Sequence, residues 1–103
     1  MSDILERLAQ TIEARKGASP QTSHTALMLS KGGAKCAEKF GEEAIEAIIE
    51  AARGDKYALK SEAADVLYHL QVMLSASGVP WGDVLAELER REGVSGIEEK
   101  ASR

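Results

Sequence analysis

Apolar positions recur every three or four residues along most of the chain, a spacing that predicts helices. The first helix starts near Asp3, which forms a capping-box-like start with Glu6, and ends at Gly17. Four further helical segments follow, each bounded by glycine or proline, at about residues 23–30, 34–53, 55–77 and 80–91. No segment keeps a period of two, so the sequence predicts an all-α fold.

Two of the predicted helices are long and consecutive, with only the Gly54-Asp55 break between them. Such a short connection favours a helical hairpin of two antiparallel helices, with the shorter helices flanking it. The third helix is apolar over an arc of about 200°, which is wide for a helix with one buried side. We therefore expect a second copy to complete a multi-helix bundle, as a homodimer or a higher homo-oligomer.

The third predicted helix also carries a stripe of carboxylates. Its members fall within about 100° of one another on a helical wheel: Glu42, Glu43, Glu46 and Glu50. Taken alone, a charged stripe of this kind is usually a face exposed to solvent.

The fourth predicted helix changes that interpretation. Glu62, Asp65 and His69 project from the middle of its apolar face, and the polar side, with Lys60 and Gln71, lies opposite. Buried carboxylates are rare unless they are paired or bind a metal. The two helices together therefore predict a site in which these acids are used.

Cations must balance these acids. Lys39 lies on the acidic stripe, but one lysine cannot neutralise five carboxylates, and two carboxylates about 4 Å apart repel by roughly 4 kcal/mol at an effective dielectric of 20. Oxygen ligands at this charge density suit Mg²⁺, with Mn²⁺ as the second candidate. A di-iron bundle is disfavoured, because His69 follows Asp65 by four residues and the third helix has no histidine. His69 itself is equally compatible with a site residue and with a hydrogen-bonded core histidine.

Two motifs contain the acids: Glu42-Glu43-Ala44-Ile45-Glu46 and Glu62-Ala63-Ala64-Asp65. This pattern resembles the signature of the all-α nucleoside triphosphate pyrophosphatase superfamily, in which such acids hold Mg²⁺ on facing helices. Four segments narrow the resemblance to the phosphoribosyl-ATP pyrophosphatase family: residues 39–44, 62–70, 83–88 and 99–103. The resemblance spans roughly residues 4–103.

The resemblance implies hydrolysis of phosphoribosyl-ATP to phosphoribosyl-AMP and pyrophosphate, the second step of histidine biosynthesis. By motif position the metal ligands would be Glu43, Glu46, Glu62 and Asp65, with Glu42 as the candidate base that activates water. The candidate substrate contacts are Lys31, Lys39, His69, Lys100, Ser102 and Arg103. His24 stands where the family pattern predicts a tyrosine.

Composition narrows the alternatives. The net charge of −4 disfavours a nucleic-acid partner, and no apolar run approaches the length of about 20 residues that spans a membrane. With no signal peptide visible, we expect a cytoplasmic protein. Cys36 lies in an alanine-rich helix and is expected to be buried. A single domain covers residues 1–103, and its polar tail, about 92–103, is expected to bind substrate phosphate.

Two other functions remain open. The first is a housekeeping pyrophosphatase that acts on nucleoside triphosphates such as dUTP, which the segment 99–103 disfavours. The second is a non-catalytic helical dimerisation module, which predicts solvated carboxylates and no tight metal site.

Overall fold

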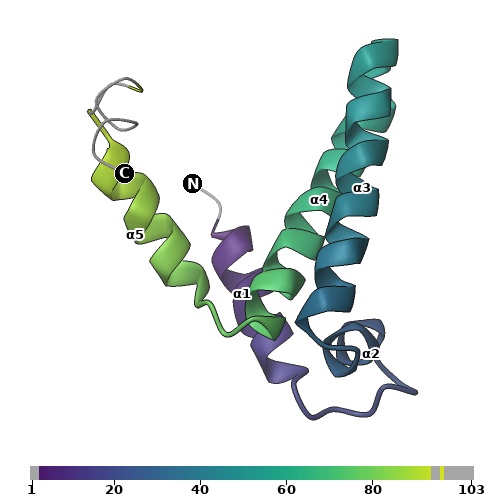
Figure 1. Ribbon diagram of the computed structural model, residues 1–103, viewed down its shortest axis with the longest axis vertical. Helices are drawn as coiled ribbons and strands as arrows, with labels where there is room; N and C mark the ends of the chain where they lie inside the picture. The colour runs from purple at the N-terminus through teal and green to yellow at the C-terminus, as the bar shows by residue number, and fades with distance from the viewer. Residues whose placement is uncertain (1–2, 94–95, 97–103) are drawn as a thin grey trace.

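The structure, a computed structural model, describes residues 3–93 and 96 (Figure 1). Within them all regular structure is helical, in the order α1 (Ile4–Ala14), α2 (His24–Ser30), α3 (Gly33–Arg53), α4 (Lys56–Ala76) and α5 (Trp81–Arg91). The predicted all-α class is confirmed, and the predicted helix ends agree with the structure to within three residues. None of the described helices combines the length and the apolar character needed to cross a membrane.

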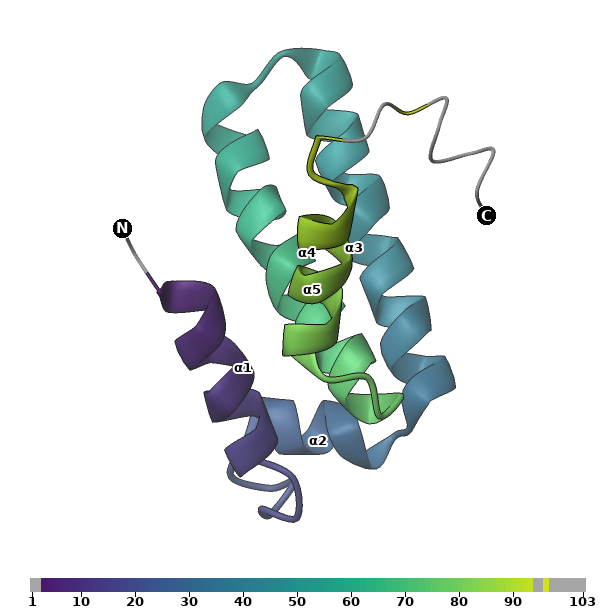
Figure 2. The same ribbon diagram turned by 90° about the vertical axis from the view of Figure 1, so that its left-hand side faces the viewer.

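Helices α3 and α4 form the expected antiparallel hairpin (Figure 1). Gly54 follows α3 with φ of 76°, a left-handed conformation that favours glycine. Asp55 then caps α4, because its side chain accepts a hydrogen bond from the backbone N–H of Ala58 at 2.9 Å. This two-residue connection leaves the two helices packed side by side along their length (Figure 2).

The hydrophobic core lies at the open end of the hairpin, where α1 and α2 cover it (Figure 2). Its buried members are Ile12, Met28, Cys36 and Val72. The Cys36 thiol also donates a hydrogen bond to the Met28 carbonyl oxygen at 3.2 Å. The cysteine is therefore a buried packing residue, as its surroundings in the sequence predicted.

Two expectations about α1 and α4 are wrong. Asp3 does precede α1, but its side chain makes no capping hydrogen bond and instead forms an ion pair with Arg7. Gln71, expected on the polar side of α4, is 3% exposed. It is buried because α1 packs over this face, and its Nε2 donates to the Leu5 carbonyl oxygen at 2.9 Å. The second half of α4 is thus enclosed from two sides.

Helix α5 diverges from the hairpin and buries none of its residues (Figure 1). Pro80 precedes it, and its apolar positions include Leu88, which is 58% exposed. An amphipathic helix normally packs its apolar side against another element. Within the part of the chain that is described, this side of α5 is only partly covered, since Trp81, Val84 and Leu85 are half-buried and Leu88 is exposed.

One contact between α1 and α4 predicts a pH effect. Ser75 Oγ donates to Glu13 Oε1 at 2.9 Å, and Lys16 Nζ lies 3.2 Å from the same oxygen. The Ser75 hydrogen bond, aided by Lys16, holds the pKa of Glu13 below its ordinary value of 4.5. The resulting stability is present above that value and is lost as pH falls through the folded-state pKa.

Glu13→Gln should therefore lower the free energy of unfolding at pH 7 by less than about 1 kcal/mol, because the side chain is exposed and its interactions are screened. The difference from the wild type should shrink as the pH falls below 4.5. Urea unfolding at pH 7 and pH 3 measures this difference. An equal difference at both pH values would contradict the assignment.

Candidate functional site

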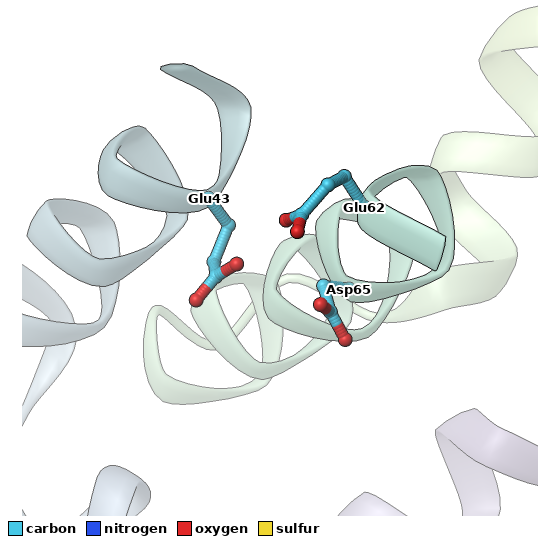
Figure 3. Close-up of side chains that lie close together, drawn as sticks. All are labelled: Glu43, Glu62 and Asp65. Atoms are coloured by element: carbon cyan, nitrogen blue, oxygen red, sulfur yellow. The ribbon is translucent and has the colours of Figure 1, made fainter. Parts of the chain in front are cut away.

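The two acidic motifs meet across the hairpin. Carboxylate oxygens of Glu43 on α3 and of Glu62 and Asp65 on α4 all lie within 4.8 Å of one another. Figure 3 shows Glu43 on one side of the group and the other two acids on the facing helix. The register of the hairpin places them opposite each other, because Glu43 precedes Gly54 by eleven residues and Asp65 follows it by eleven.

Burial is graded across this group, which we call the acidic cluster. Glu43 is 8% exposed, Glu62 is half-buried and Asp65 is exposed. The expectation that Asp65 lies inside an apolar face is thus wrong for the single chain, where that side of α4 is left open. For Glu43 the burial contradicts the solvated carboxylates that a non-catalytic module would carry.

The Glu62 carboxylate is incompletely satisfied. Its Oε2 is buried and has no hydrogen-bond partner among the described residues. A buried acceptor without a donor costs about 1–3 kcal/mol, and more when it is charged. Oxygen atoms of this kind, converging from two helices, fit a hard divalent cation such as Mg²⁺.

Glu46 adjoins the acidic cluster one turn beyond Glu43. Hydrogen bonding with Glu43, together with the charges of Glu43 and Glu62, raises the pKa of Glu46 above its ordinary value. The four acids that the motifs nominate as ligands are therefore gathered in one place. Glu42 is exposed beside them, with Oε2 at 3.6 Å from Lys39 Nζ.

Glu43 has a lysine and a histidine as neighbours. Lys39 Nζ lies 3.3 Å from Glu43 Oε1, and His69 Nε2 lies 4.0 Å from the same oxygen. Burial opposes ionisation of Glu43, but hydrogen bonding with Glu46 and the Lys39 ammonium outweigh it and hold the pKa of Glu43 below its usual value. Burial lowers the pKa of His69, which is 6% exposed, and outweighs the opposing effect of the Glu43 charge.

A contact that the sequence did not reveal ties α2 to α4 beside this site. The Thr25 hydroxyl hydrogen-bonds to the Tyr68 hydroxyl. The Tyr68 ring then packs edge-on against the His69 ring, with centroids 4.9 Å apart. Only the adjacency of Tyr68 and His69 signalled this arrangement in the sequence, and it helps to fix the orientation of His69.

Of the remaining predicted substrate contacts, Lys31 is the one that the structure describes. Lys31 is exposed at the end of α2, where its charge acts on the Cys36 thiol. His24 is exposed on α2 and lies close enough to His69 for their charges to interact. The predicted contacts in the tail lie outside the described residues: Lys100, Ser102 and Arg103.

A cavity of about 590 Å³ lies elsewhere, between α1, the end of α4 and the start of α5. Its walls include Ile12, Leu74 and Trp81, and none of the carboxylates of the acidic cluster lines it. We place the functional site at the acidic cluster, because the groups able to hold a metal and polarise a phosphate lie there.

Comparison with known proteins identifies the family of the chain. The family described as phosphoribosyl-ATP pyrophosphohydrolase matches residues 5–92. A phosphoribosyl-ATP pyrophosphatase of Cereibacter sphaeroides is 69% identical over 100 residues, covering 97% of each chain. The protein of that name from Dinoroseobacter shibae is 69% identical, and the match covers 97% of this chain and 98% of the relative. The protein of that name from Paracoccus denitrificans is 70% identical, and the match covers 96% of this chain and 92% of the relative. The chain therefore belongs to the phosphoribosyl-ATP pyrophosphohydrolase family, a family of hydrolases.

Proposed function

We propose that this chain hydrolyses phosphoribosyl-ATP to phosphoribosyl-AMP and pyrophosphate, the second step of histidine biosynthesis. The observation that carries the proposal is the convergence of Glu43, Glu62 and Asp65 from two facing helices. The relatives that match over nearly the whole chain are named for activity on this substrate. Because that substrate derives from ATP, a metabolite of the cytoplasm, we propose the cytoplasm as the compartment.

Four residues would hold the metal: Glu43, Glu46, Glu62 and Asp65. We propose Mg²⁺, with Mn²⁺ as a substitute, because the donors are all carboxylate oxygens. When bound, the ion would offset negative charge on the substrate phosphates and on the leaving pyrophosphate. The unpaired Glu62 Oε2 supports this assignment, since a cation would supply its missing partner.

The residues around the metal ligands have separate proposed roles. Glu42 is exposed beside the acidic cluster and outside the group of three converging acids, so its carboxylate remains able to take a proton from the attacking water. Lys39 and Lys31 are proposed to contact phosphate. The burial of His69 favours support of Glu43 over direct contact with substrate. In the tail, Lys100, Ser102 and Arg103 remain proposed phosphate contacts.

We propose a homodimer as the working form. Three isoleucines on one side of α3 are 58%, 65% and 48% exposed, at positions Ile45, Ile48 and Ile49. A contiguous apolar surface of this kind on a small protein usually marks an interface. Leu88 on α5, which is 58% exposed, adds to the surface that a second copy would bury.

The test is a pyrophosphate-release assay on purified protein with phosphoribosyl-ATP, run with Mg²⁺ and with EDTA. We expect turnover with Mg²⁺ only, and much weaker release from dUTP. Faster release from dUTP than from phosphoribosyl-ATP would point to a housekeeping pyrophosphatase. No release from either substrate in the presence of Mg²⁺ or Mn²⁺ would refute the proposed function.

A further inference from the structure

Lys39 lies on the acidic stripe of α3 and contacts the acidic cluster directly, through Glu43. Its Nζ lies 3.3 Å from Glu43 Oε1 and 3.6 Å from Glu42 Oε2, so one ammonium bridges two carboxylates. The two pairs have spacings of four and three residues, which bring side chains together on one helix face. Lys39 is half-buried, and the Glu43 side chain is 11% exposed. The contact to Glu43 is thus partly shielded from solvent.

The Lys39 ammonium is a positive charge beside a group of negative charges around Glu43. Four carboxylates gather there, namely Glu43, Glu46, Glu62 and Asp65. Other ion pairs of α1 and α3 lie outside these four acids: Lys16 pairs with Glu13, Lys35 with Glu38 and Arg53 with Glu50.

We propose that Lys39 is a built-in counter-ion of the metal site, which holds the Glu43 carboxylate in place in the metal-free protein and competes with a divalent cation for it. The proposal rests on the proposed function, because it takes Glu43 as a metal ligand. Lys39 is in this respect a positioning residue. With a metal bound at Glu43, the Lys39 ammonium would be free to contact substrate phosphate.

This role differs in its consequences from two simpler ones. A lysine in an ordinary surface ion pair contributes up to about 1 kcal/mol and has no effect on metal affinity. A lysine that only binds phosphate changes the KM for substrate and leaves metal binding without substrate unaltered. A counter-ion opposes the metal, since its positive charge repels a divalent cation at the same carboxylate.

The experiment compares Lys39→Met with Lys35→Met as the matched control. Lys35 lies one turn earlier on α3 and is exposed, and its Nζ pairs with Glu38 Oε2 at 3.2 Å, outside the acidic cluster. Mn²⁺ is titrated calorimetrically into each protein without substrate. We expect Lys39→Met to bind Mn²⁺ about tenfold more tightly than the wild type, and Lys35→Met to stay within about twofold of it.

Urea unfolding in EDTA gives the second readout. Lys39→Met should unfold at a lower urea concentration than Lys35→Met, because four carboxylates lose their counter-ion. Lys39→Arg keeps the charge and should restore both the wild-type midpoint and the wild-type affinity for Mn²⁺. If Lys39→Met fails to fold, Lys39→Arg is compared with the wild type in both measurements.

Several outcomes overturn the counter-ion role. It fails if Lys39→Met binds Mn²⁺ as the wild type does or more weakly, or if Lys39→Arg binds more tightly than the wild type. If no protein binds Mn²⁺, the proposed metal site fails, and the EDTA midpoints alone decide whether Lys39 is a counter-ion. Equal midpoints for Lys39→Met and Lys35→Met would then exclude it.

Discussion

Asp65→Asn is expected to reduce Mg²⁺-dependent pyrophosphate release by about a hundredfold or more, and to leave the metal-free protein at least as stable as the wild type. Asp65 lies within 4.8 Å of two other carboxylate oxygens, so an asparagine removes a ligand charge and one source of repulsion. The structure gives Asp65 no hydrogen bond or ion pair within residues 3–93 that the change would break. Steady-state turnover at several Mg²⁺ concentrations, beside urea unfolding in EDTA, measures both effects.

Asp83→Asn is the matched control, since it makes the same change at an exposed position in the first turn of α5. It should keep near wild-type turnover. A structural Asp65 predicts the opposite pattern, with destabilisation of roughly 1–3 kcal/mol in EDTA and activity falling only as folding fails. An Asp65→Asn protein that is destabilised without metal yet turns over well with Mg²⁺ would refute the ligand assignment.

Ile48→Asp is expected to convert a dimer into a monomer. Ile48 is 65% exposed in the single chain, and Ile45 and Ile49 on the same helix are exposed as well. Burying an isoleucine side chain contributes roughly 1.5–3 kcal/mol, and a twofold interface loses this contribution from both copies. The dimer dissociation constant should therefore rise by at least about a hundredfold.

Sedimentation at micromolar concentration distinguishes an 11.0 kDa species from one of twice that mass. Ile48→Leu keeps the apolar area at the same position and should sediment with the wild type. If the wild type itself sediments as a monomer, the proposed homodimer is wrong. A dimeric Ile48→Asp protein would instead place the interface elsewhere, for example on α5.

Much of the fold followed from local patterns in the sequence. The turn at Gly54 and Asp55 was predictable, because a left-handed glycine followed by a capping aspartate is chemistry within a few residues. The burial of Gln71 was not, because it depends on α1 packing across α4, and the amide finds its partner at Leu5. Helix periodicity assigns a polar residue to the solvent side and contains no information about a distant backbone carbonyl.

The candidate site, like the fold, was predictable from the sequence only in part. The spacing within each motif predicted which acids share a helix face, and the short turn predicted that the two faces meet. The gradient from buried Glu43 to exposed Asp65 depends on which parts of α4 the other helices cover. The Thr25–Tyr68 contact depends on where α2 crosses α4, which no local pattern specifies.

Glu43 and Asp65 are each eleven residues from Gly54 in the sequence. This equal separation restricts where residues can be inserted between the two acids. Inserting one residue between the turn and either acid rotates that side chain by about 100° and shifts it by about 1.5 Å, which separates the ligands. Lengthening both helices together by one turn, about seven residues in all, extends the hairpin and keeps the acids opposed. Homologous chains should therefore tolerate insertions between the two motifs in steps of about seven residues, and single-residue insertions should be confined to the turn itself.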